Sequence, residues 1–561
     1  MPPGRVARVK TRLSIRFLAV LLVVSMACSS DAGTDASNES VSIPPRQEEN
    51  RRVSRQMARI ACGLPKAQLV RIRNGYHPKR SGDIQFVTRA PNVLGTYFPH
   101  SGPWTYIQHV PMLWYGPGHV PAIGEVRRQV TMADVAPTIA RFLRFPFKDR
   151  SGKPMREALG PADDPPAPPR VVLVVVWDGG GRNVLAEHPD DWPVIRRLRA
   201  KGVWYENATV GSSPTHTASV HATLGTGAFP GTHGRIDGVF RVRGRLVRPE
   251  SLGPRDLLLP SLADLYDRAN ENVPLVAAVG ATPWHLGMIG SGSHFEGGDQ
   301  DIAVLQLRVA WGLSRKDANY FRAPSYATRM DGYEELRAQI DREDGVIDGS
   351  WYDERFVEGP NVLLKHTTIG WQTRIIREIV RREGFGDDRV PDLLFVNYKQ
   401  IDAIGHGASM NSPDMGAVVR RTDAALSGLI DLLDTEVGRG RWVLALTADH
   451  GSTPKGSASG GLAIPMPDFL ADLRAAFDDD DDRDILQVSR VNQMWVNWQE
   501  MQENGVTLED ISRWMVRYRV GDVVADPSSL PEGLAAQRLF TAAFPSYVLD
   551  RLPCLPGGAD D

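Results

Sequence analysis

The sequence predicts an α/β fold with a mostly parallel central sheet, because three apolar runs end in acids or histidines. These runs cover residues 169–181, 391–407 and 441–451. The first, PRVVLVVVWDGGG, is a continuous β-branched run, as in parallel strands that are buried on both faces. Between the second and the third, residues 412–434 place apolar side chains at helical spacing. A strand, a helix and a strand in this order form the repeating unit of a parallel sheet.

Each predicted strand ends in side chains that can bind a metal ion. They are Asp178, Asp402, His406, Asp449 and His450. Because the carboxyl ends of parallel strands meet at one edge of a sheet, we expect these side chains to converge. Carboxylates and imidazoles are ligands for zinc and similar metals. The sequence therefore predicts a metal centre at this edge.

The first 28 residues have the pattern of an export signal. A basic segment precedes the apolar residues 17–27, which are too few to span a membrane comfortably. The apolar segment ends at Cys28 and resembles a bacterial lipoprotein signal, in which the cysteine carries the lipid. We expect the protein to be exported and anchored to the membrane through Cys28, with plain secretion as the alternative. The polar residues 29–65 are predicted to form a disordered tether.

The composition of the chain is that of an ordinary globular protein. Its formal net charge of −2 gives no indication of nucleic-acid binding.

A linker and two insertions are predicted along the chain. Residues 151–170 form a proline-rich linker before the first strong strand. The mixed patterns of residues 238–390 and 455–550 predict insertions that cap the site, and the acidic run 478–484 is interpreted as a solvated turn.

A segment dense in hydroxyl groups and glycines, residues 211–234, supplies candidate nucleophiles. It resembles the motif of type I phosphodiesterases and nucleotide pyrophosphatases in the alkaline phosphatase superfamily, P-T-x-T-x-x-x-H-x-T-x-x-T-G followed by P-x-x-H-G. The matching positions are Pro214, Thr215, Thr217, His221, Thr223, Thr226, Gly227, Pro230, His233 and Gly234. This register makes Thr217 the nucleophile, whereas a second register would select Ser212.

The resemblance implies an alkaline-phosphatase-like three-layer α/β/α sandwich that holds two divalent metal ions, which we expect to be zinc. It assigns one ion to Asp178, Thr217, Asp449 and His450, and the other to Asp402, His406 and one further histidine. Metal coordination lowers the pKa of a threonine hydroxyl, which is otherwise a poor nucleophile. The implied reaction forms a phosphothreonine that water then hydrolyses.

The further histidine is absent from its usual place, because no histidine follows His450. The family's last ligand lies in a segment resembling THGSxxxYDTHVPLxFYG, and residues 97–118 resemble that segment. His100 aligns with the metal ligand, and His109 aligns with a later histidine that we interpret as structural. The flanking residues 74–84 and 130–143 also resemble parts of the same region.

This order implies a circular permutation. Residues 66–150 would be the C-terminal segment of the family's catalytic domain moved to the front, and residues 171–550 would be the main part of that domain. Permutation is tolerated because domain termini usually lie close together at the surface. The new ends would lie near Cys62 and Cys554, and a disulfide between these residues would join them.

The phosphate pocket departs from the family in several positions. Monoesterases of the family use a Lys-x-Arg pair, but the corresponding residues 276–292 contain neither lysine nor arginine. Val220 stands where nucleotide pyrophosphatases have a phosphate-binding asparagine, and Gly238 stands where an asparagine is common. Lys399 is interpreted as a solvated strand-end lysine, with an anion contact as the alternative. Four further histidines near the presumed site are not expected to be ligands: His216, His221, His233 and His285.

The expected substrate is a small phosphodiester or nucleotide-type molecule, because the pocket lacks the charges of a strong monoesterase. The alternatives are a phosphomonoesterase of the alkaline phosphatase type, a sulfatase or phosphonate hydrolase, and a non-catalytic metal-binding pseudoenzyme. The sequence does not predict an oligomeric state.

Overall fold

The computed structural model describes residues 54–555, with internal gaps. The residues left undescribed within this range are 96–97, 161–165, 308–309, 344, 352–353, 356–365 and 479–482. The predicted export signal, Cys28 and most of the predicted tether lie outside the described residues. Among the described residues, no helix combines the length and the apolar character that a bilayer span requires.

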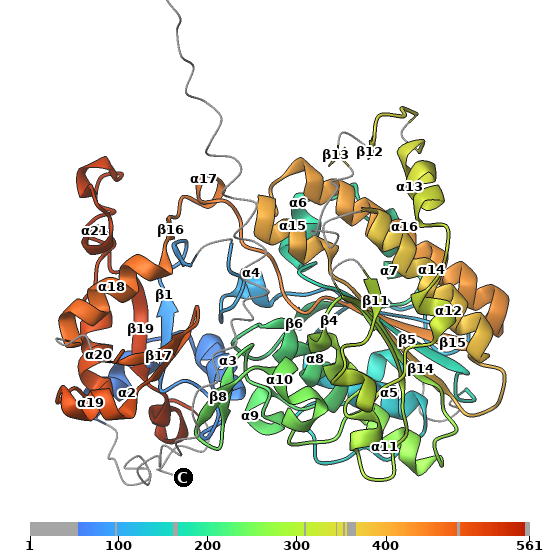
Figure 1. Cartoon of the computed structure of the whole chain (residues 1–561), viewed down its shortest axis with the longest axis horizontal. Coiled ribbons are helices and arrows are strands. Elements are labelled where there is room, and N and C mark those ends of the chain that lie inside the picture. Colours follow the sequence, from blue (N-terminus) through green and yellow to red (C-terminus); the bar gives the residue numbers. More distant parts are fainter. Residues whose placement is uncertain are drawn as a thin grey trace, which may run out of the picture. The chain divides into compact units, whose positions relative to one another are not determined.

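Within the described part of the chain, nine strands form a mostly parallel sheet that confirms the predicted fold class (Figure 1). Its order is β11-β10-β9-β14-β5-β15-β3-β6-β4. Strands β10, β9, β14, β5 and β15 pair in parallel, as do β6 and β4, while β3 is antiparallel to both of its neighbours. In sheet order the bounds are Ala310–Gly312, Ile302–Leu307, Val276–Gly280, Asp392–Tyr398, Val171–Trp177, Trp442–Thr447, Met112–Tyr115, Val203–Thr209 and Gly124–Thr131.

Helices cover both faces of this sheet, which gives three layers (Figure 1). The side chains of β5 alternate between two apolar cores: Leu173 and Val175 face one, and Val172 and Val174 face the other. The first core includes α7 (Pro193–Arg199), α14 (His366–Glu383) and α16 (Pro413–Leu433). The second includes α5 (Val135–Phe142), α8 (Thr217–Thr226) and α11 (Leu262–Ala269). Burial on both faces explains why the β5 sequence is continuously apolar.

The expectation that residues 238–390 form a capping insertion is wrong for part of that range. Strands β9, β10 and β11 come from it and complete one side of the central sheet. β9 (Val276–Gly280) is short and rich in small residues, so its pattern is weak in the sequence, yet each of its residues is buried. Pairing with β14 and β10 defines this strand.

A smaller sheet joins residues from near both ends of the described chain. Among the described residues it has four strands in the order β17-β18-β1-β19. They span Leu486–Ser489, Gln493–Val496, Ile84–Thr88 and Phe540–Pro545. Its core also contains side chains of α2 (Arg55–Cys62), α3 (Lys66–Gly75), α18 (Met466–Phe477) and α20 (Leu508–Met515).

The predicted tether is wrong at its C-terminal end, where α2 forms. Ser54 caps this helix, and its side chain accepts a hydrogen bond from the amide of Met57. Met57 and Ala61 lie four residues apart on one helix face, and both are fully buried. The mostly polar composition obscured this narrow apolar stripe in the sequence.

The predicted disulfide between Cys62 and Cys554 is confirmed. The two α-carbons are 5.9 Å apart, and the bond closes a sequence separation of 492 residues. It links the end of α2 to the segment after η10 (Ser546–Arg551). A bond that closes so long a loop restricts the unfolded chain strongly.

Removing this disulfide is expected to destabilise the protein. For the Cys62→Ser/Cys554→Ser double variant, the loop-closure estimate gives a decrease in the free energy of unfolding on the order of 5 kcal/mol. Chemical unfolding of the oxidised protein, the reduced protein and the double variant measures this effect. Equal stability of all three would contradict the prediction.

A cluster of carboxylates beside α11 predicts a pH-dependent loss of stability. The side-chain oxygens of Asp267, Asp299 and Asp301 lie within 4.8 Å of one another. Burial, with the negative charges of Asp299 and Asp264, raises the pKa of Asp267 to about 7. The folded protein therefore holds this proton more tightly than the unfolded chain, so this group's contribution to stability falls as the pH rises from about 4 to about 7.

Asp267→Asn is therefore expected to raise the free energy of unfolding at pH 8 by about 1–3 kcal/mol, with a smaller gain at pH 5. The amide is neutral at both pH values and can donate a hydrogen bond to a neighbouring carboxylate. Denaturant titrations at the two pH values test this, with the exposed Asp431→Asn on α16 as the control. An equal gain at both pH values, or none at pH 8, would contradict the assignment.

Candidate active site

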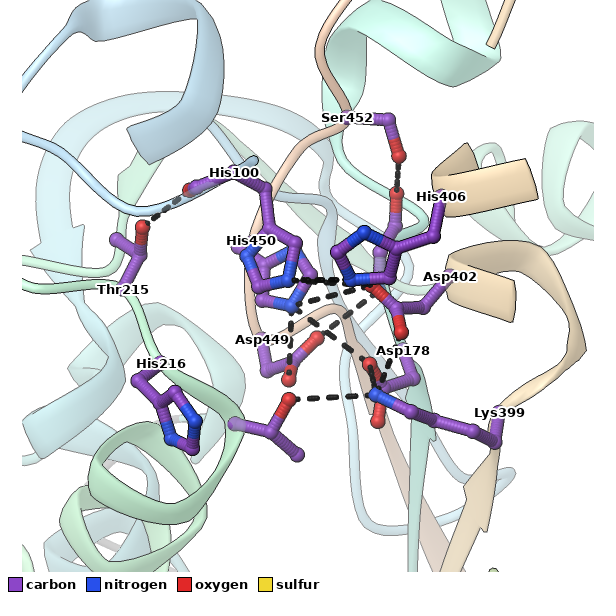
Figure 2. Close-up of polar contacts among 12 residues, drawn as sticks. His100, Asp178, Thr215, His216, Lys399, Asp402, His406, Asp449, His450 and Ser452 are labelled. Carbon is purple, nitrogen blue, oxygen red and sulfur yellow. Dashed lines mark hydrogen bonds and ion pairs between the residues drawn. The ribbon is translucent and has the colours of Figure 1, made fainter. Parts of the chain in front are cut away.

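The ends of three parallel strands bring the predicted metal-binding side chains to one edge of the sheet. Asp178 directly follows β5, and Asp449 and His450 follow β15. Asp402 and His406 lie on α15 (Gln400–Ala408), which begins just after β14. Figure 2 shows these side chains pointing toward one another.

Glycines allow the segments after these strands to approach closely. A Cβ atom on Gly179, which has a φ of +73°, would lie 2.8 Å from the Cα atom of Asp402. A Cβ atom on Gly181 would lie 2.4 Å from the Cα atom of Gly451. The glycines after Asp178 and His450 therefore give the backbone contacts that bring the three strand ends together.

His100 lies beside Asp402 and His406, as the sequence predicts. Its loop precedes α4 (Thr105–Gln108) and is held at two points: the Thr215 hydroxyl donates to the His100 carbonyl at 2.7 Å, and the Thr453 hydroxyl donates to the Pro99 carbonyl at 2.6 Å. The loop is thus attached both to the segment before Thr217 and to the segment after His450.

The donor atoms of His100, Asp402 and His406 form a compact group. The Nε2 atoms of the two histidines are 3.1 Å apart, and they lie 3.4 and 3.5 Å from Oδ1 of Asp402. A tetrahedral zinc ion with bonds of about 2.0–2.1 Å separates neighbouring ligands by roughly 3.3 Å. Burial and the neighbouring His450 lower the pKa of His100, which favours the neutral imidazole that metals require. These residues fit a metal ion.

A second donor group adjoins the first through His450. The ring of His450 stacks on that of His100 with centroids 3.6 Å apart (Figure 2). Its Nε2 atom lies 3.4 Å from Oδ2 of Asp449, 3.6 Å from Oδ1 of Asp178 and 3.8 Å from Oδ1 of Asp402. Oδ2 of Asp449 and Nε2 of His450 are buried and have no hydrogen-bond partner. Two buried donors without partners indicate that a cation belongs here.

The observed groups of donor atoms differ from the predicted ligand sets in the position of Asp402. The donor atoms of Asp178, Asp402 and His450 lie within 4.8 Å of one another, so Asp402 adjoins both groups. Asp449 contacts His450, and its other oxygen accepts a hydrogen bond from the amide of Gly179 at 3.0 Å. Burial and the negative charge of Asp178 raise the pKa of Asp449, consistent with an excess of negative charge at this edge.

Thr217 is the first residue of α8, and His216 caps the helix by accepting a hydrogen bond from the amide of Ala218. Oγ1 of Thr217 lies 3.3 Å from Nζ of Lys399, which also binds Asp178. The structure therefore places Thr217 beside the predicted metal-binding residues. Ser212, the other candidate nucleophile, is buried, and its backbone carbonyl accepts a hydrogen bond from the side chain of Gln108.

The interpretation of Lys399 as a solvated lysine is wrong. This residue is 8% exposed, and its ammonium lies 2.8 Å from Oδ1 of Asp178 and 2.6 Å from Oδ2 of Asp402. Burial alone would lower the pKa of the ammonium, but the carboxylates of Asp178 and Asp402 outweigh that effect and raise it. Lys399 is therefore a fixed positive charge in the site.

Asn397, His285 and His221 form a network of polar contacts that includes Oδ2 of Asp178. Their role was not predicted from the sequence. The Oδ2 atom of Asp178 accepts a hydrogen bond from Asn397 at 3.0 Å and lies 3.3 Å from Nε2 of His285. Asn397 also contacts Nε2 of His221, whose other ring nitrogen contacts the carbonyl of Thr217 at 2.8 Å. Partners of this kind fix the orientation of metal ligands. The one signal in the sequence is a polar residue, Asn397, inside an apolar strand.

Three other histidines have contacts of a structural kind. His233 contacts the hydroxyl of Thr223 at 3.0 Å and accepts a hydrogen bond from the amide of Arg235. His109 lines a separate cavity with Tyr106. Nε2 of His216 lies 3.9 Å from Asp237, and burial lowers its pKa to about 4.

The fold and the site together define a member of the alkaline phosphatase superfamily. Within it, residues 172–510, more than half of the chain, match the family described as type I phosphodiesterase / nucleotide pyrophosphatase. The chain belongs to this family, as the motif around Thr217 predicted.

Two curated relatives have alkaline phosphatase names. PafA of Elizabethkingia meningoseptica is 35% identical over 102 residues, covering 17% of this chain and 18% of that protein. PhoV of Synechococcus elongatus is 22% identical over 304 residues, covering 46% of this chain and 54% of that protein. The chain thus spans between about a fifth and about half of the length of these relatives. The crystal structure of wild-type PafA aligns with a TM-score of 0.48 at 15% identity, over 68% of this chain and 85% of that chain.

Proposed function

We propose that this protein is a hydrolase of phosphate esters that uses two divalent metal ions and a phosphothreonine at Thr217. The observation that carries the proposal is the convergence of carboxylates and imidazoles from three strand ends and the His100 loop beside the Thr217 hydroxyl. Asp178, Thr217, Asp449 and His450 would hold one ion, and Asp402, His406 and His100 the other. Bound zinc would supply Lewis-acid stabilisation of negative charge and favour the Thr217 alkoxide.

The chain's own residues account for the nucleophile and its orientation. Thr217 loses its proton, its oxygen bonds to phosphorus, and the bond from phosphorus to the leaving oxygen breaks as the leaving group takes up a proton. Water then loses a proton as its oxygen bonds to phosphorus, the bond from phosphorus to Thr217 breaks, and the Thr217 oxygen takes up a proton to restore the hydroxyl. The amino terminus of α8, where Thr217 lies, favours negative charge.

We favour a phosphodiester or nucleotide-type substrate. The absence of lysine and arginine from residues 276–292 supports this choice, because a diester carries less charge than a monoester. In the structure this segment contributes His285, which faces Asp178. The names of the curated relatives and the charge of Lys399 favour phosphomonoesters as the second candidate.

Zinc-loaded protein assayed with p-nitrophenyl phosphate and bis-p-nitrophenyl phosphate tests this proposal, with Thr217→Ala as the control. We expect metal-dependent turnover with a preference for the diester. A monoester preference would overturn the substrate assignment. No turnover of any phosphate or sulfate ester would overturn the enzymatic function and favour a pseudoenzyme.

We propose further that the chain order is permuted and that the protein is exported. The position of His100 beside Asp402 and His406 and the disulfide from Cys62 to Cys554 support the permutation. The basic and apolar segments before Cys28 support export and lipid anchoring. Metabolic labelling with a radioactive fatty acid, compared with Cys28→Ala, tests the anchor, and an unlabelled wild-type protein would contradict it.

A further inference from the structure

Lys399 is a buried cation whose hydrogen-bond donors all face the candidate site. An ammonium group has three N–H donors and no acceptor. The three nearest acceptors are Oδ1 of Asp178 at 2.8 Å, Oδ2 of Asp402 at 2.6 Å and Oγ1 of Thr217 at 3.3 Å. Two carboxylates thus hold the ammonium in place (Figure 2). Its remaining donor faces the Thr217 hydroxyl, which the proposed function makes the nucleophile.

The ammonium contacts atoms of both proposed metal-binding groups, since Asp178 and Thr217 belong to one and Asp402 to the other. The histidines of one group face Oδ1 of Asp402, whereas Lys399 binds Oδ2 of the same carboxylate. Among the described ion pairs, Lys399 reaches Asp178 and Asp402, but Asp449 lies beyond ion-pair distance. Oδ2 of Asp449 and Nε2 of His450 have no hydrogen-bond partner. The ammonium therefore leaves Oδ1 of Asp402, Oδ2 of Asp449 and Nε2 of His450 available to metal ions, and it shares Asp178 and Thr217 with one of them.

Lys399 supplies a positive charge near Thr217, whereas residues 276–292 contain no lysine or arginine. A phosphoryl group on Thr217 carries its negative oxygens two bonds beyond Oγ1, through phosphorus, within reach of a donor that contacts Oγ1. Hydrogen bonds from a charged donor to such oxygens are among the strongest in proteins, and fixed charges act most strongly in a site that excludes water. Lys399 is 8% exposed and is held by two carboxylates, so it does not have to reorganise during the reaction.

We propose that Lys399 is a catalytic residue that binds the transferred phosphoryl group while it is attached to Thr217. This inference rests on the proposed function and gives the pocket a positive charge that residues 276–292 do not supply. The ligand chemistry is a tetrahedral or five-coordinate oxyanion such as phosphate or vanadate. Because the amine forms no covalent bond, Lys399 contributes only hydrogen bonds and charge.

Binding of orthovanadate to the zinc-loaded full-length protein, measured by calorimetry, tests the proposal. We expect Lys399→Met, a neutral side chain of similar length, to bind vanadate at least about tenfold more weakly, because a hydrogen bond to a charged group contributes about 1.5–3 kcal/mol. Zinc content, measured in parallel, is expected to stay at the wild-type value. Lys201→Met, at an exposed lysine before β6, is the matched control and should change neither quantity. Lys399→Gln is a second neutral variant, should the methionine prevent folding.

Each outcome bears on one proposal. Unchanged vanadate affinity in a folded neutral variant with wild-type zinc content would overturn the role of Lys399. Loss of zinc from that variant would also overturn it, because Lys399 would then be a positioning residue for the metal ligands. If the wild-type protein neither binds vanadate nor hydrolyses any ester, the proposed function itself fails.

Discussion

Thr217→Ala is expected to lower kcat for any phosphate ester by roughly 10³-fold or more, because it removes the oxygen to which phosphorus is transferred. Thr217 lies at the start of α8 and is 2% exposed, so loss of its hydroxyl removes few packing atoms. The zinc content should change little, since Asp178, Asp449 and His450 remain. Thr217→Ser keeps a hydroxyl and should retain much of the activity. Steady-state kinetics, circular dichroism and metal analysis measure these effects.

Ser212→Ala is the matched control, because the second register of the motif selects Ser212. Its side chain is buried, and its contact with Gln108 is made by the backbone carbonyl, so replacing the side chain should leave kcat within a few-fold of the wild-type value. Loss of activity in a folded, metal-loaded Ser212→Ala protein, with Thr217→Ala active, would transfer the nucleophile to Ser212.

The second large effect is expected for His100→Ala. This change removes one of the three donors His100, Asp402 and His406, so one zinc ion should bind much more weakly and activity should fall by at least about tenfold. Metal analysis after dialysis is expected to find about one ion per chain fewer than in the wild-type protein. Excess zinc should restore part of the activity, because the other donors remain.

His109→Ala is the control for His100, since both histidines come from the same segment. His109 lies in the wall of another cavity and should not alter the zinc content. A His100→Ala protein with full zinc content and activity would contradict the assignment of His100 as a ligand. It would also contradict the proposed permutation, because the permutation was inferred from a ligand segment, containing His100, that lies before the strands instead of after them.

The parts of the structure that could be predicted from the sequence are those with strong local patterns. Strands β5, β14 and β15 are buried on both faces, so each reads as an apolar run that ends in a polar ligand. The convergence of Asp178, Asp402 and His450 follows from parallel pairing, which brings the strand ends to one edge.

Other features depend on contacts between distant segments and leave little local signal. The small residues of β9 become a strand only by pairing with β14 and β10. The environment of Lys399 is set by Asp178 from a neighbouring strand and Thr217 from α8, so the lysine looks like an ordinary strand-end charge in the sequence. The same holds for His285, whose role comes from Asp178 across the site.

The central claim is that Thr217 carries the phosphoryl group during turnover. Zinc-loaded protein is mixed with an excess of bis-p-nitrophenyl phosphate, quenched in acid and digested, and the peptide that contains Thr217 is analysed by mass spectrometry. The proposed mechanism predicts a phosphoester adduct located on Thr217, absent from the Thr217→Ala protein and from protein treated with a chelator. Turnover of the substrate with the adduct on Ser212, or with no adduct on the protein at all, would contradict it.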